Sequence, residues 1–213
     1  MSDATYRFLL SLSIIFPFSV SVFKFKQIPV SYHPLVYVIS LGLINEIITY
    51  YFFRSGNAIP TNIYNLLEFI FYCRQFRNWK HILQKKFSYY LTTISVALFW
   101  ITDEIILGKL NTFTSFFLIL YPFLLVLLAV NELNFLVANE HGNVLKNPIF
   151  LFCIAVIIFY AYRILSEIFY RYTDDHELQN RIFDIQAYVN VLFNILLTFV
   201  ILCIPKKRTI TLR

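Results

Sequence analysis

Residues 148–170 read PIFLFCIAVIIFYAYRILSEIFY, and only Arg163 and Glu167 in this stretch carry a charge. A helix that crosses a bilayer needs roughly 17–25 predominantly apolar residues. The stretch has that length and composition. Asn147 and Pro148 at its start are typical of a helix cap followed by a first-turn residue. The segment therefore predicts a membrane-spanning α-helix.

Six further runs share this character and occupy most of the remaining chain. Hydrophobic residues make up 59% of the 213 residues, charged residues make up 14%, and the mean hydropathy is +0.66. A soluble domain has about 25% charged residues. The composition therefore excludes a soluble enzyme, a nucleic-acid-binding domain and a disordered chain. The expected spans are Phe8–Phe23, Pro34–Phe53, Asn57–Phe76, Phe87–Leu107, Thr112–Phe135, Pro148–Tyr170 and Ile182–Ile204.

These runs predict an all-α, polytopic membrane protein, in which residues 1–213 form a single seven-helix bundle without a soluble domain. The first run is the shortest and contains Pro17, so a cleaved signal peptide is the alternative. Asp3 balances Arg7 before this run, and no small-residue cleavage pattern follows Phe23. We expect the run to remain as a helix.

Basic residues divide unequally between the two sides that seven spans would create. Short cytoplasmic loops are enriched in Lys and Arg. The distribution predicts an outer N-terminus and a cytoplasmic C-terminus in the cell membrane, which is the inner membrane if the source is bacterial. Five basic residues fall on the N-terminal side, namely Arg7, Arg54, Lys109, Arg171 and Arg181. Twelve fall on the other side, namely Lys24, Lys26, Arg74, Arg77, Lys80, Lys85, Lys86, Lys146, Lys206, Lys207, Arg208 and Arg213.

Ionisable side chains inside a span are costly unless they are paired or line a wet cavity. Most of them are expected in the outer half of the bundle, and Glu46, Glu68 and Arg163 are the deepest. These three indicate either a polar ligand pocket or a structural arginine–carboxylate clamp. The expected ligand-binding residues are Glu46, Asn62, Asn65, Glu68, Arg163, Glu167, Asn190 and Asn194, with Asp103, Glu104 and Asp184 at the rim.

Structural roles compete with this interpretation at several positions. Asp103, Glu104 and Asp184 lie near helix ends, where they could simply reach headgroup water. Asn62 and Asn65 could serve as hydrogen-bonding contacts between helices. Glu167 follows Arg163 by one turn, so an ion pair within the helix is also possible.

Signatures of catalysis and of metal binding are missing from the sequence. No HExxH or GxSxG motif occurs, and the four histidines lie outside the expected spans or at their edges. The seventh span contains no lysine, which excludes a retinal Schiff base. Cys73, Cys153 and Cys203 are expected to be free thiols, and a three-thiolate metal site is the alternative. We expect no catalytic residue, metal or cofactor.

The layout resembles the stand-alone seven-helix modules of bacterial membrane sensors. The residues that carry this resemblance are Asn62-Ile-Tyr-Asn-Leu-Leu-Glu68 and Asn190-Val-Leu-Phe-Asn194, and it covers the general arrangement only. It implies a module that binds or senses a small polar or cationic ligand and acts through a membrane protein partner or a homo-oligomer. The alternatives are a proton-coupled or cation transporter and a lipid-modifying enzyme that uses a carboxylate pair. No nucleic-acid partner is expected.

Overall fold

The structure is a computed structural model that describes residues 3–52, 58–79, 83–139 and 144–207. Helices dominate these segments, and none of the described residues forms a strand. The expected span limits Phe53 and Asn57 fall outside the described residues. So do Arg54, Lys80, Arg208 and Arg213 from the charge distribution.

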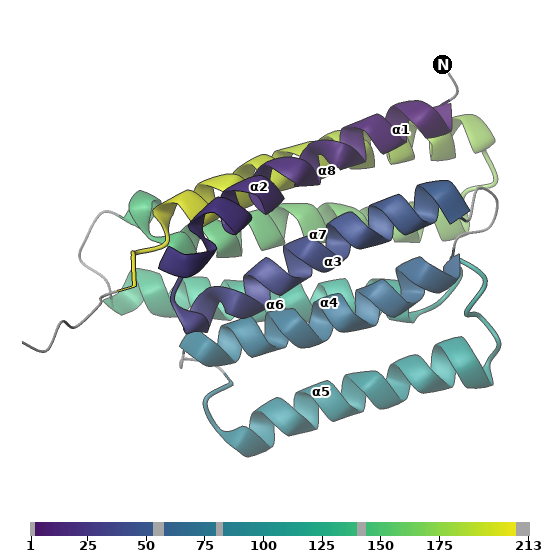
Figure 1. Cartoon of the computed structure of the whole chain (residues 1–213). Coiled ribbons are helices and arrows are strands. Elements are labelled where there is room, and N and C mark those ends of the chain that lie inside the picture. Colours follow the sequence, from purple (N-terminus) through teal and green to yellow (C-terminus); the bar gives the residue numbers. More distant parts are fainter. Residues whose placement is uncertain (1–2, 53–57, 80–82, 140–143, 208–213) are drawn as a thin grey trace, which may run out of the picture.

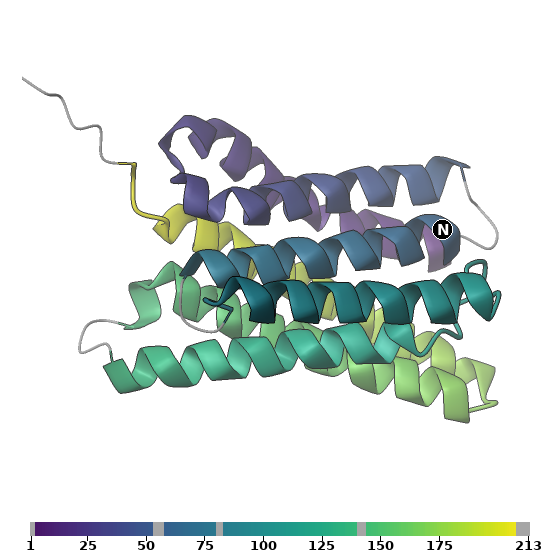
Figure 2. The ribbon, with the colours of Figure 1, turned by 90° about the horizontal axis from the view of Figure 1, so that it is seen from below.

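The long helices lie side by side, and successive ones run in opposite directions (Figure 1). Figure 2 shows the same rods from below. The first rod joins α1 (Asp3–Ser11), η1 (Leu12–Ile14), α2 (Ile15–Lys24) and η2 (Phe25–Gln27). The others are α3 (His33–Phe52) after the short turn η3 (Val30–Tyr32), α4 (Ala58–Trp79), α5 (Lys86–Trp100) with the π-helical η4 (Ile101–Ile106), α6 (Phe117–Asn139), α7 (Pro148–Tyr172) after η5 (Val144–Lys146), and α8 (His176–Cys203).

The bundle has two ends, which we name by the chain termini. At the N-terminal end, where α1 and α8 begin, Arg7 Nε lies 2.8 Å from Asp184 Oδ1. At the C-terminal end, where α2 and α8 finish, the amide of Lys207 donates to the carbonyl of Gln27 at 2.8 Å. The first and last rods are therefore joined at both ends.

Five of the described helical segments are long and apolar enough to cross a membrane. They are Thr5–Gln27, Val30–Tyr51, Phe117–Asn139, Pro148–Tyr172 and His176–Cys203. Large apolar side chains also face outward: Phe87 is 75% exposed and Ile106 is 70% exposed on the rod formed by α5 and η4. A soluble protein rarely presents extended apolar surface of this kind. The expected all-helical character is thus confirmed for the described residues, and their long apolar helices are consistent with a membrane protein.

Helix α4 is more polar than these five segments because one side of it is packed inside the protein. It contacts α3, α5 and α6, and its buried face includes Asn62, Asn65, Glu68 and Gln75. A helix that meets protein on this face can satisfy polar side chains with neighbouring groups, as lipid cannot. This explains why α4 is not among the segments that are apolar enough to count as candidate spans.

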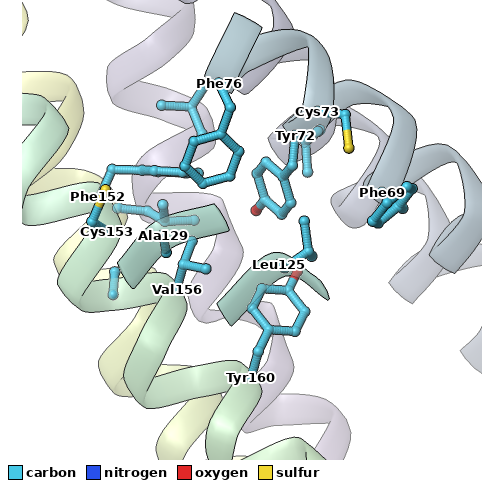
Figure 3. Packing of buried hydrophobic residues seen from close by; sticks show 14 of the residues in the cluster. Phe69, Tyr72, Cys73, Phe76, Leu125, Ala129, Phe152, Cys153, Val156 and Tyr160 are labelled. Carbon is cyan, nitrogen blue, oxygen red and sulfur yellow. The ribbon is translucent and has the colours of Figure 1, made fainter. Parts of the chain in front are cut away.

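Aromatic side chains near the end of α4 and the start of α7 pack against one another (Figure 3). Tyr72 meets Phe152 edge-on at 5.4 Å between ring centroids, and Phe76 meets the same ring at 5.8 Å. Leu125 and Ala129 of α6 complete this layer and are fully buried. We call this group the aromatic floor, because it closes the interior toward the C-terminal end.

Several helix limits differ from expectation, and side-chain capping accounts for two of them. The run expected from residue 112 becomes helical only at Phe117, because the amide of Phe117 donates to the Asp103 carboxylate and residues before it form a loop. The last span, expected from Ile182, is part of a longer helix: α8 already begins at His176, and Asp175 Oδ1 accepts from the amides of Glu177 and Leu178. At α7, Asn147 Oδ1 accepts from the amide of Ile149, so the expected cap is confirmed.

Candidate functional site

A cavity of about 750 Å³ lies among α1, α3, α4, α7 and α8. Its lining runs from Thr5 and Tyr50 at the N-terminal end to Val38 and Leu197, which lie in the half of the bundle nearer the C-terminal end. Ligand pockets in proteins typically measure about 300–1,000 Å³. The cavity therefore has the size of a small-molecule site.

Six of the eight expected ligand-binding residues line this cavity, although they come from four different helices. Glu46 comes from α3, Asn65 and Glu68 from α4, Arg163 from α7, and Asn190 and Asn194 from α8. Asn62 and Glu167 are absent from the described lining. The tertiary structure thus separates Asn62 from Asn65, and Glu167 from Arg163.

Arg163 links α7 to α4 at the cavity wall. Its Nη2 donates to Asn65 Oδ1 at 3.1 Å, and its Nη1 lies 3.9 Å from Glu68 Oε2. The guanidinium also lies over the ring of Tyr121, 5.2 Å from the centroid. The structure therefore contains both the expected arginine–carboxylate clamp and a cavity. Arg163 contacts residues of α4, and its side chain, which is 17% exposed, also lines the cavity.

Two tyrosines that sequence reasoning did not single out complete this polar cluster. Tyr64 donates to Glu68 Oε1 at 2.8 Å, and Tyr121 lies 3.1 Å from Asn65 Oδ1 and 3.3 Å from Glu68 Oε2. Tyr64 could have been found, because it precedes Glu68 by one helical turn. No sequence signal connects Tyr121 of α6 to this cluster.

Gly42 allows the first rod to approach this cluster. A Cβ at this position would lie 2.7 Å from Ile14 Cδ1 and 3.2 Å from the Tyr64 hydroxyl. Only a residue without a side chain leaves both groups where they are. The glycine within the second expected span is therefore a point of close contact next to the cavity.

Glu46 differs from the other charged residues of the cavity. It is half-buried, and its polar neighbours there include Ser11 and Arg163. Among the described residues it makes no ion pair within 4 Å, whereas the charges of Arg7 and Arg163 are engaged by Asp184 and Glu68. Of the two acidic residues in the described lining, Glu46 and Glu68, Glu46 is therefore the one without a close cation among the described residues.

The first helix borders the cavity at the N-terminal end. Arg7 of α1 is held by Asp184 of α8, and Phe8 stacks on Tyr50 of α3 with ring centroids 3.7 Å apart. Deeper in the bundle, Asn194 Nδ2 donates to Ser13 Oγ at 2.8 Å. The expected rim residue Asp184 therefore lies at the mouth, where it fastens α1 across the opening.

The other two expected rim residues belong to a separate, buried network that holds the loop between η4 and α6. Asp103 Oδ1 lies 2.9 Å from Lys109 Nζ, and Asp103 Oδ2 accepts from Ser115 Oγ at 2.7 Å. Asn62 Nδ2 donates to Glu104 Oε2 at 3.0 Å and to the carbonyls of Leu110 and Thr112. These contacts join the loop to α4 and η4, so we assign the network a structural role, although Asn62 Oδ1 and Glu104 Oε1 are buried without a hydrogen-bond partner among the described residues.

The described residues offer no metal centre. No group of three or more His, Cys, Asp or Glu side chains among them is placed to hold an ion. Cys73 and Cys153 are buried free thiols, and Cys203 is a half-buried one.

Comparisons with protein-family models, curated proteins and solved structures gave no match.

Proposed function

We propose that all seven rods cross the membrane, with the N-terminal end of the bundle outside and the C-terminal end in the cytoplasm. The distribution of basic residues supports this orientation. Within the described residues, Arg7, Lys109, Arg171 and Arg181 lie at the N-terminal end, while Lys24, Lys26, Arg74, Arg77, Lys85, Lys86, Lys146, Lys206 and Lys207 lie at the C-terminal end. A reporter enzyme that works only outside the cell and is fused after Arg213 is expected to be inactive, and an active fusion would reverse the orientation.

In this orientation the cavity faces outward and binds a small organic ammonium ion, which makes the protein a ligand-binding or sensing module. One observation carries the proposal: Glu46 faces the cavity without an ion-pair partner among the described residues, whereas both lining arginines are engaged by carboxylates. A half-buried carboxylate attracts a cation, because the cost of burying its charge falls when a partner of opposite sign arrives.

The remaining lining suits an organic cation better than a bare metal ion. Aromatic rings of Phe8, Tyr50, Tyr64 and Phe183 border the cavity, and ring faces attract ammonium groups. Asn65 Nδ2 is buried without a hydrogen-bond partner among the described residues, so it can donate to a ligand oxygen. The ligand class is therefore an ammonium compound that also carries a hydroxyl or carbonyl oxygen.

Binding is favoured over transport because the cavity ends on the aromatic floor. Phe76 and Phe152 of this layer are fully buried, and they lie between the middle of the bundle and its C-terminal end. A transporter needs a second arrangement that opens this layer. A sensor needs only a conformational change that a membrane partner or a second copy can detect. Helix α1 is placed to undergo such a change, because Arg7 and Phe8 hold it at the mouth of the cavity.

Binding can be tested with the purified protein in lipid nanodiscs by calorimetry. The probes are choline, which carries a hydroxyl, tetramethylammonium, which does not, and sodium at matched ionic strength. We expect choline to bind most tightly and sodium not to compete. Glu46→Gln should weaken choline binding by at least about tenfold, or about 1.4 kcal/mol.

Glu167→Gln is the matched control, because it makes the same chemical change on a half-buried residue that is absent from the described lining. It should leave choline binding within about twofold of the wild type. If neither organic ion binds, or if Glu167→Gln costs as much affinity as Glu46→Gln, the proposed site is wrong. Choline uptake into proteoliposomes would favour transport instead.

A further inference from the structure

A second hollow, of about 730 Å³, lies at the opposite end of the bundle. It is formed by η3 and the start of α3 on one side and by the end of α4 on the other. Its lining includes Val30, Ser31, Tyr37, Arg74 and Arg77. We call it the basic groove.

The groove carries positive charge that the described residues do not neutralise. Arg74 is exposed and Arg77 is half-buried, and no described carboxylate lies within 4 Å of either side chain. The described lining contains no Asp or Glu. The Arg77 guanidinium is oriented by Tyr89, whose ring centroid lies 4.6 Å away. Two guanidinium groups that line the same groove are suited to bind a phosphate group.

Hydrogen bonds hold the walls of the groove together. The side-chain amides of Gln75 and Asn78 both donate to the carbonyl of Ser31, at 2.9 and 3.0 Å. Gln75 Oε1 in turn accepts from the amide of Leu35 at 3.2 Å. The turn η3 is thus attached to α4, and the groove is a built feature of the fold.

Exposed apolar surface continues from the groove along α3. Tyr37 lines the groove, is 44% exposed and contacts Phe71 with ring centroids 6.0 Å apart. Ile44, Ile47 and Tyr51 follow as exposed residues at helical spacing, so they extend the same face of α3 toward the N-terminal end. A hydrocarbon chain can lie along this face while a headgroup occupies the groove.

We propose that the basic groove binds an anionic phospholipid, with the headgroup phosphate held by Arg74 and Arg77 and one acyl chain packed along α3 from Tyr37. Free phosphate would satisfy the arginines but would leave the adjoining apolar face unused. The lipid assignment is independent of the outer cavity and of its ligand.

The inference can be tested by native mass spectrometry of the full chain with phosphatidylglycerol, with phosphatidylcholine, and with inorganic phosphate as a competitor. We expect phosphatidylglycerol to be retained and phosphatidylcholine to be lost. Arg74→Ala/Arg77→Ala should weaken phosphatidylglycerol binding by about thirtyfold, since each basic residue near an anionic surface contributes about five- to sixfold.

Lys85→Ala/Lys86→Ala is the matched control, because it removes two exposed charges at the same end but outside the described groove lining. It should change binding by no more than about threefold, as expected for loss of unspecific attraction. Arg74→Gln alone alters an exposed side chain and preserves the fold, so it serves if the double variant is unstable, with about a fivefold loss expected. Equal losses in the two double variants, or complete competition by millimolar inorganic phosphate, would overturn the lipid site.

Discussion

Arg163 Nη2 on α7 lies 3.1 Å from Oδ1 of Asn65 on α4, and the same guanidinium reaches Glu68 one turn further along α4. One cation therefore holds two neighbouring turns of a packed helix at the wall of a cavity. This contact fastens two helices that are about one hundred residues apart in the chain.

The Arg163–Glu68 contact should behave as a coupled pair. We expect Arg163→Met and Glu68→Gln each to lower the free energy of unfolding by about 1–3 kcal/mol, because each leaves a buried polar partner unsatisfied. The double variant should cost about 1 kcal/mol less than the sum of the two single changes. Denaturation with sodium dodecyl sulfate in mixed micelles measures all three. Strict additivity would show that the pair does not interact.

The size of the side chain at position 42 should affect ligand binding in the cavity next to it. A Cβ there meets Ile14 Cδ1 and the Tyr64 hydroxyl, which are ends of side chains that can move. We expect Gly42→Ala to retain choline binding within about threefold, since relief of glycine's helix penalty offsets a small shift. Gly42→Leu should displace Tyr64 and weaken binding by at least about tenfold. Calorimetry distinguishes the two variants, and equal affinities would mean that this contact does not shape the site.

Two ion pairs at the N-terminal end should differ in their contribution to stability. Asp103 is buried and accepts hydrogen bonds from Lys109 and Ser115, whereas Glu177 and Arg181 are 76% and 72% exposed. We expect Asp103→Asn to cost about 1–3 kcal/mol and Glu177→Gln less than about 0.5 kcal/mol. Thermal unfolding with hydrogen exchange of the loop before Phe117 measures this. Unchanged exchange in Asp103→Asn would contradict the structural role of the network.

The cap of α7 should contribute measurably to the stability of that helix. Asn147 Oδ1 accepts from the amide of Ile149 at 2.8 Å. Asn147→Ala should lower the free energy of unfolding by about 1 kcal/mol, while Asn147→Ser keeps an acceptor and should stay within a few tenths of the wild type. The same denaturation assay applies, and equal costs for alanine and serine would show that the side-chain cap is unimportant.

Much of α7 could be read from the sequence, because its apolar length, its asparagine cap and its first-turn proline are local features. The polar residues along one side of α4 show what local sequence features do not determine. Three-residue spacing places Asn62, Asn65 and Glu68 along one side of the helix, but it does not say which neighbour each one meets. In the structure Asn62 joins Glu104 and the loop before α6, while Asn65 and Glu68 join Arg163.

Composition and apolar run length by themselves predicted an all-helical chain with segments long and apolar enough to cross a membrane. These features are local, because lipid admits only long apolar segments whose backbone hydrogen bonds are made internally. The contacts of Glu68 with Tyr64 and Tyr121, the hollow beside Glu46 and the fastening of α1 by Arg7 were decided only by the tertiary structure. The physical reason is that side-chain pairing between helices depends on their order and rotation in the bundle. Several arrangements of the same helices satisfy the bilayer equally well, and packing selects one.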